Sequence, residues 1–366
     1  MSKEFIPAAK PLIGKEEEEA VQRVLESGMV AQGPQVAAFE EEFSAQMAKG
    51  ASSCAVNSGT SALHVGLLAA GIGPGDEVIV PSFTFAATAN SVAMTGAKPV
   101  FADIEADYFN LDPKHVEEQI TEHTKAIMPV HLYGHPAKME QIVKIAQEHN
   151  LFVFEDCAQA HGATLKGKQV GTFGAFGAFS FYPTKNMTAG EGGMITTSDP
   201  EVLRRAKMIR NQGMEKRYAN ELVGVNNRMT DINAAIGREQ LKKVGAWTET
   251  RQQNAKYLSD HIEGVITPKV MEGATHVYHQ YTIRVESDRD GFQQALKDEY
   301  QIGSGVYYPI PNHKLPSLAE YAPNLELPVT QQVAEQCLSL PVHPSLDQED
   351  LERIVEAVNK LAQAGA

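Results

Sequence analysis

Residues 179–193 read FSFYPTKNMTAGEGG, and this stretch is the most informative about the fold. It opens with the alternation of small and aromatic residues that is typical of a strand, and Pro183 ends that strand because proline cannot donate to a sheet ladder. Lys185 therefore lies in a loop at the strand's edge, just before a glycine-rich turn. Most lysines are solvated surface charges. A lysine in this setting can instead be desolvated, which lowers the pKa of its amine and frees it to form a Schiff base.

Upstream of this stretch, short apolar strands alternate with helices. Strands are predicted at residues 53–56, 77–80, 98–104, 125–130 and 151–155, with helices from residue 60, around residue 90, and at residues 113–120 and 139–150. Such alternation predicts a layered α/β domain with a mostly parallel sheet. Residues 174–182 and 193–197 are predicted to be consecutive strands without a full helix between them.

The two ends of the chain have a different character. Residues 15–48 predict two amphipathic helices separated at Gly33-Pro34, and a long helix is predicted at residues 230–261. After Gly264 we expect strands at 280–285 and 304–308, with helices at 289–300, 330–337 and 348–362. We therefore predict a large domain at residues 1–264 and a smaller α+β domain at residues 265–366.

Composition and charge exclude several classes of protein. The formal net charge of −14 argues against a nucleic-acid partner, which would require clustered lysine and arginine. Three scattered cysteines, Cys54, Cys157 and Cys337, indicate a reducing compartment and no structural zinc. The first residues lack the apolar core of a signal peptide, and no apolar run reaches the length of a membrane span. We expect a cytoplasmic enzyme that contacts no membrane.

Two further segments can carry chemistry. NSGTSAL at residues 57–63 opens a helix, where amides and hydroxyls can bind an anion, although serine and threonine at a helix start are more often simple caps. FEDCAQAH at residues 154–161 places Asp156 at a strand end, where open α/β sheets bind ligands. That carboxylate could pair with a protonated pyridine nitrogen or could merely cap the next turn. His131 and His135 lie at a strand end without metal-ligand spacing, so no metal site is predicted.

Taken in order, these segments resemble the DegT/DnrJ/EryC1/StrS aminotransferases over nearly the whole chain. These pyridoxal-phosphate (PLP) enzymes of fold type I, the fold of aspartate aminotransferase, make amino sugars from nucleotide-linked keto sugars. Further matching motifs are GDEV at 75–78, PSFTF at 81–85, the region 213–231, YYP at 307–309 and LSLP at 338–341.

The resemblance implies a role for each matching residue. Lys185 would hold PLP as a Schiff base and move the proton, and Asp156 would keep the pyridine nitrogen protonated. The other cofactor contacts would be Gly59, Thr60, Ser61, Phe85, Gln159 and Ser180. Asn226 and Arg228 match the segment with which a partner subunit completes the phosphate site of a homodimer. Tyr308 and His313 would contact the substrate, although a surface-loop role for His313 is about as plausible.

The resemblance also implies a reaction. Glutamate would donate the amino group, pyridoxamine phosphate would be the intermediate form of the cofactor, and a nucleotide-diphosphate keto sugar would accept the amine. Two alternatives remain open: a PLP-dependent deoxysugar dehydratase, although those relatives carry histidine in place of the lysine, and a non-catalytic sensor of the same fold. The sequence does not decide between amination at C3 and at C4, nor which nucleotide the sugar carries.

Overall fold

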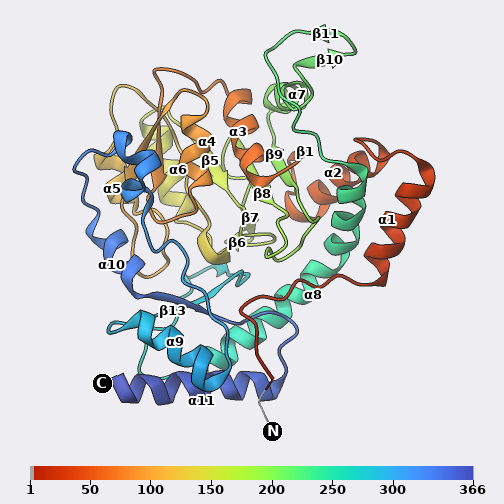
Figure 1. Cartoon of the computed structure of the whole chain (residues 1–366). Helices are drawn as coiled ribbons and strands as arrows, with labels where there is room; N and C mark the ends of the chain where they lie inside the picture. The colour runs from red at the N-terminus through yellow and green to blue at the C-terminus, as the bar shows by residue number, and fades with distance from the viewer. Residues whose placement is uncertain (1–3, 366) are drawn as a thin grey trace.

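The computed structural model describes residues 4–365 and is built around one seven-stranded sheet with helices on both faces (Figure 1). The strand order is β1-β9-β8-β5-β4-β2-β3. The strands are β1 (Ser52–Val56), β2 (Glu77–Pro81), β3 (Lys98–Ala102), β4 (Thr124–Ile127), β5 (Phe152–Asp156), β8 (Phe176–Ser180) and β9 (Gly193–Thr197). The α/β fold class and the predicted pair of consecutive strands, β8 and β9, are confirmed.

Strand β2 shows why this sheet needs helices on both faces. Its side chains alternate between two cores: Val78 and Val80 pack on one face, and Ile79 packs on the other. All three are fully buried, as expected for a strand in the interior of a parallel sheet. The first core lies under helices α3 (Gly59–Ala69), α4 (Ala87–Ala93) and α7 (Pro200–Ile209). The second lies under α5 (Pro113–Glu118) and α6 (Met139–Glu148).

The strand directions bring several loops to one edge of the sheet. β2, β4, β5 and β8 run parallel to one another, and β1 runs antiparallel to β9, which is itself antiparallel to β8. The carboxyl ends of β1, β2, β5 and β8 therefore share one edge, which is where ligands bind in open α/β sheets.

A long helix, α8 (Asp231–His261), connects the two ends of the molecule (Figure 1). Helices α1 (Lys15–Ser27) and α2 (Pro34–Met47) pack against its first half. Asp231, the first residue of α8, binds the start of α2 because its carboxylate accepts the amides of Gly33, Gln35 and Val36. The predicted break at Gly33-Pro34 is thus confirmed as the start of α2.

The C-terminal part forms a separate core around Tyr281 and Leu340. It contains β13 (Tyr281–Arg284), β14 (Cys337–Leu340), α9 (Arg289–Tyr300), α10 (Pro328–Gln336) and α11 (Gln348–Gly365), with short 3-10 turns at Asn312–Lys314 and Pro316–Tyr321. The strand predicted at 304–308 is wrong, because that segment makes only an isolated bridge from Gly305 to Ser339. The partner of β13 is instead β14. The division into domains at residue 264 stays a prediction.

Smaller pairs complete the structure. β6 (Thr164–Leu165), β7 (Lys168–Gln169) and β12 (Ala274–Thr275) form a small sheet, and Leu132–Gly134 forms a short 3-10 turn. β10 (Met214–Lys216) and β11 (Ala219–Asn220) form an arm that extends away from the body (Figure 1). Among residues 4–365, no helix is both long enough and apolar enough to cross a bilayer.

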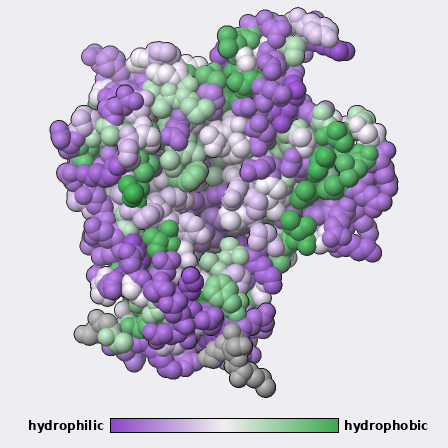
Figure 2. Space-filling view, viewed as in Figure 1, coloured by the Kyte–Doolittle hydropathy of each residue, from purple (hydrophilic) through white to green (hydrophobic). Residues whose placement is uncertain are grey.

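Part of the surface is apolar. Figure 2 shows hydrophobic side chains gathered over α1 and the connection to α2. The large apolar residues exposed there are Leu25, Met29 and Val30. We call these three residues the α1–α2 patch.

Candidate active site

A cavity of about 560 Å³ lies at the carboxyl edge of the sheet. Its wall is contributed by the ends of β1, β2, β5 and β8, and segments 279–280 and 307–308 complete it. Eight of the residues singled out from the sequence lie together in this wall: Gly59, Thr60, Phe85, Asp156, Gln159, Ser180, Lys185 and Tyr308.

Lys185 enters the cavity from a turn that follows β8. Its backbone amide donates to the carbonyl of Tyr182 at 2.9 Å, which closes the turn around Pro183. Burial lowers the pKa of the Lys185 amine to about 8, and the charge of Asp156 acts in the opposite direction. A larger fraction of this amine is therefore neutral near pH 8 than for an ordinary lysine, as a nucleophilic amine requires.

Asp156, at the end of β5, is 4% exposed. Its carboxylate accepts the Thr88 hydroxyl at 2.8 Å and the Ala158 amide at 3.1 Å. Burial raises the pKa of this carboxyl, while the two hydrogen bonds and the charge of Lys185 oppose that rise. A buried carboxylate of this kind favours a cationic partner, and a pyridinium N–H supplies both the charge and a donor.

The start of α3 lies directly against Ser180. A Cβ added at Gly59 would lie 2.7 Å from the Ser180 Cβ, so only glycine permits this approach. The first amides of a helix lack intrahelical acceptors and favour anions. Ser58 caps the helix by accepting the Ser61 amide at 3.0 Å. Thr60 and Ser180, which line the cavity, therefore flank a helix terminus suited to a phosphate group.

Phe85 and Gln159 lie at different depths in the same wall. Phe85 is 63% exposed although it is a large aromatic residue, and this leaves a free ring face at the cavity. Gln159 is buried and donates from Nε2 to the Tyr308 hydroxyl at 2.7 Å.

In the part of the chain that the structure describes, four predicted residues do not line this cavity: Ser61, Asn226, Arg228 and His313. The Ser61 hydroxyl donates to Asn57 Oδ1 at 2.6 Å, so it serves the helix start. His313 is buried, and its Nδ1 lies 2.6 Å from the Ser82 hydroxyl. Asn226 bridges to Asn211, and Arg228 donates to the Asn211 side chain at 2.8 Å. The roles proposed for these residues stay predictions.

Several cavity residues were not predicted, and Thr88 is the most informative of them. It reaches Asp156 across 68 positions of sequence, so only the fold reveals the contact. His279 also lines the cavity, from the segment before β13. The unpredicted remainder of the wall is Ser58, Leu63, Thr84, Ala87, Val130, Ala158, Tyr182, Thr184, Glu191, Gln280 and Tyr307. In the sequence, Thr88 is marked only by its position four residues after Thr84, in the segment that follows β2.

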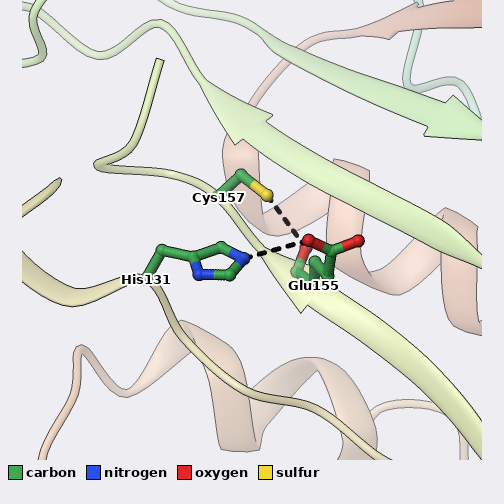
Figure 3. A group of neighbouring side chains, drawn as sticks. All are labelled: His131, Glu155 and Cys157. Carbon is green, nitrogen blue, oxygen red and sulfur yellow. Dashed lines mark hydrogen bonds and ion pairs between the residues drawn. The ribbon is translucent and has the colours of Figure 1, made fainter. Parts of the chain in front are cut away.

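His131, Glu155 and Cys157 form a buried group near β5 (Figure 3). Glu155 accepts His131 Nε2 at 3.0 Å and three backbone amides at 2.7–2.9 Å. His131 Nδ1 accepts the Ala137 amide, so the proton of this ring lies on Nε2. Since both ring nitrogens and both carboxylate oxygens are already engaged, this group supports the loop at 171–174 and does not present free metal ligands.

The comparisons with known proteins agree with this geometry. Residues 11–359 match the model of the DegT/DnrJ/EryC1/StrS aminotransferase family. This chain belongs to that family. One relative, a dTDP-3-amino-3,4,6-trideoxy-alpha-D-glucose transaminase of Streptomyces venezuelae, is 40% identical over 98% of this chain and 95% of its own. A pleiotropic regulatory protein of Geobacillus stearothermophilus is 45% identical over 82% of each chain.

Solved structures show the same relationship. DesV of S. venezuelae, in complex with a ketimine intermediate, superposes with a TM-score of 0.91 at 41% identity and covers 95% of this chain and 94% of its own. A Streptococcus pneumoniae protein in its PLP form gives a TM-score of 0.93 at 27% identity, covering 99% of this chain and all of its own. The fold predicted from the sequence, that of PLP-dependent aminotransferases, is confirmed.

The residues present fit PLP, the cofactor of the family. The cavity has an amine of lowered pKa at Lys185, a buried carboxylate at Asp156 and a helix terminus beside Ser180. These match the aldehyde, the pyridine nitrogen and the phosphate of PLP respectively. Phe85 offers a free aromatic face to the ring.

Proposed function

We propose that this chain transfers the amino group of L-glutamate to a nucleotide-linked keto sugar, with PLP held at Lys185. The observation that carries the proposal is that Lys185, Asp156 and the Gly59–Ser180 contact share one cavity although they come from different strands. Two further observations support it: membership of an aminotransferase family, and a relative named as a transaminase of a dTDP-linked amino sugar.

The positions of Asp156 and Lys185 in the cavity support a separate role for each. When bound, PLP supplies an electron sink that stabilises negative charge at the carbon bearing the amine. Asp156 would hold a positive charge at the ring nitrogen, and the Thr88 hydroxyl and the Ala158 amide keep its carboxylate oriented. Lys185, once its amine is free, would take a proton from the donor carbon and return it to the cofactor carbon on the other side of the amino nitrogen. Its lowered pKa suits both directions of this transfer.

We also propose that the active form is a homodimer. The α1–α2 patch is apolar and exposed, as expected of a surface that a second copy covers. Asn226 and Arg228 lie outside the cavity of their own chain, and this supports the proposal that they complete the partner's phosphate site. A cytoplasmic location and the absence of nucleic-acid binding stay predictions.

The test is turnover by the purified chain with PLP, glutamate and a panel of nucleotide keto sugars. We expect an aminated sugar and 2-oxoglutarate from at least one substrate, and no product from Lys185→Ala. A deoxygenated sugar in the NMR spectrum would show the dehydratase instead. Binding of sugar nucleotides without amine transfer from any donor would indicate the non-catalytic sensor. The relative from Geobacillus stearothermophilus, which is named as a regulatory protein, is the reason to include this outcome.

A further inference from the structure

The hydrogen bonds around Gln159 determine the orientation of its amide. The Tyr133 backbone N–H lies 2.6 Å from one amide atom of Gln159. A backbone N–H can only donate, so that atom must be the oxygen, Oε1. The other atom is then the NH₂ group, which lies 2.7 Å from the Tyr308 hydroxyl. Because an amide nitrogen only donates, the Tyr308 oxygen is the acceptor of this bond.

This arrangement leaves one specific donor unused by the protein bonds just described. An amide nitrogen carries two hydrogens, and Tyr308 accepts one of them. The second N–H of Gln159 remains for the cavity that Gln159 lines. Without the acceptor at Tyr308, the amide would keep only its bond to Tyr133 and could tilt about it.

Tyr308 is itself firmly held. Its ring packs edge-on against Phe83, with centroids 5.7 Å apart, and lies parallel to Tyr133 at 6.4 Å. Its backbone adopts a φ of 58°, a conformation that non-glycine residues adopt only where the surroundings enforce it. Tyr308 belongs to the segment 307–308 that completes the cavity from the C-terminal part of the chain, so it can hold the amide of Gln159 in one orientation.

We infer that Tyr308 is a positioning residue that acts through Gln159, holding the amide so that its second N–H donates to an oxygen on the ring of the bound cofactor. The inference rests on the proposed function, since it needs PLP in this cavity. It assigns to Tyr308 a role in addition to any contact with substrate.

The loss of the Gln159 donor can be measured from the pH dependence of the visible absorption band of the PLP-loaded enzyme. A donor to the ring oxygen withdraws negative charge from it and so weakens its attraction for the proton on the neighbouring cofactor–Lys185 linkage. Removing the donor should let that linkage keep its proton to higher pH. In Tyr308→Phe we expect the pH midpoint of the band to rise by about one unit, the size of one lost net hydrogen bond.

The matched control is Tyr278→Phe. Tyr278 also has a positive φ, 44°, but lies outside the cavity wall in the described chain. The pH midpoint of the visible band in Tyr278→Phe should equal that of the wild type. An unchanged midpoint in Tyr308→Phe, with only a higher KM for the sugar, would mean that Tyr308 is a substrate contact and would overturn the inference. Tyr308→Leu, which also removes the oxygen, must shift the midpoint in the same direction.

A double-mutant cycle tests whether the effect passes through Gln159. In a Gln159→Ala background, Tyr308→Phe should add no further shift, because the amide it positions is gone. An equal shift in both backgrounds would contradict the inference. A wild-type protein that showed no visible band with PLP would instead refute the proposed function, so the two failures are distinguishable.

Discussion

At the scale of single residues, Lys185 and Asp156 influence each other's charge. Burial lowers the pKa of the Lys185 amine to about 8, and the Asp156 carboxylate limits that fall because it stabilises the ammonium form. The reactive form is the neutral amine, whose fraction increases as pH rises through the pKa. The rate at which PLP attaches to the apoenzyme should therefore rise with pH and level off above about 8.

Asp156→Asn removes the carboxylate that favours the ammonium, so the midpoint of this rate profile should move below that of the wild type. Turnover should fall by roughly 100-fold, because the ring nitrogen loses the buried charge that stabilises it. Stopped-flow absorbance of apoenzyme mixed with PLP between pH 6 and 10 measures the profile. A wild-type midpoint near 10.5, the ordinary value for lysine, would show that the amine is solvated.

At the scale of elements, the contact between α3 and β8 depends on Gly59. In Gly59→Ala the new methyl group would meet the Ser180 Cβ at 2.7 Å, and both atoms are fixed to backbone. We expect a loss of about 1–3 kcal/mol in the free energy of unfolding and a PLP affinity at least tenfold weaker. The control is Gly245→Ala in α8, where nothing lies within 4 Å of the new atom. It should stabilise the protein by up to about 1 kcal/mol, as urea unfolding can measure.

The loop at 171–174 provides a second prediction at this scale. Glutamine at position 155 would turn one oxygen into a donor that faces two of the N–H groups now bonded to Glu155. Glu155→Gln should cost about 3 kcal/mol in the free energy of unfolding. Glu201→Gln, in an exposed pair with Arg204, should change it by less than about 0.5 kcal/mol. Equal effects of the two substitutions in urea unfolding would show that the buried group is not structural.

The elements also show what the sequence could and could not predict. β9 was predicted with its observed bounds because residues 193–197 follow a glycine-rich turn and contain the β-branched residues Ile195, Thr196 and Thr197. β14 was missed because Cys337–Leu340 directly follows α10, and only its pairing with β13 makes it a strand. Motifs located Lys185 and Asp156, which are next to strand ends. The bond from Thr88 to Asp156 depends on how the start of α4 packs against the end of β5, and no local sequence pattern indicates that contact.

At the scale of the whole molecule, the proposed homodimer would build each site from two chains. Lys185→Ala disables the site of its own chain, and Arg228→Ala should disable the site of the partner. Mixing the two inactive variants should restore about a quarter of the wild-type activity, since half of the randomly formed dimers are hybrids and each has one intact site. Subunit exchange under mild denaturant followed by an activity assay tests this. If the two variants carry different affinity tags and are shown to co-purify as hybrids, the absence of any recovery of activity would contradict a shared site.

The proposed function requires that the Lys185 amine carries the cofactor. Reduction of the PLP-loaded enzyme with borohydride would fix the linkage permanently, and mass spectrometry of the digested protein would locate it. We expect one pyridoxyl-phosphate group, on the peptide that contains Lys185, and no labelled peptide from Lys185→Ala that is loaded and reduced in the same way. Label on any other lysine, or none on Lys185, would contradict it.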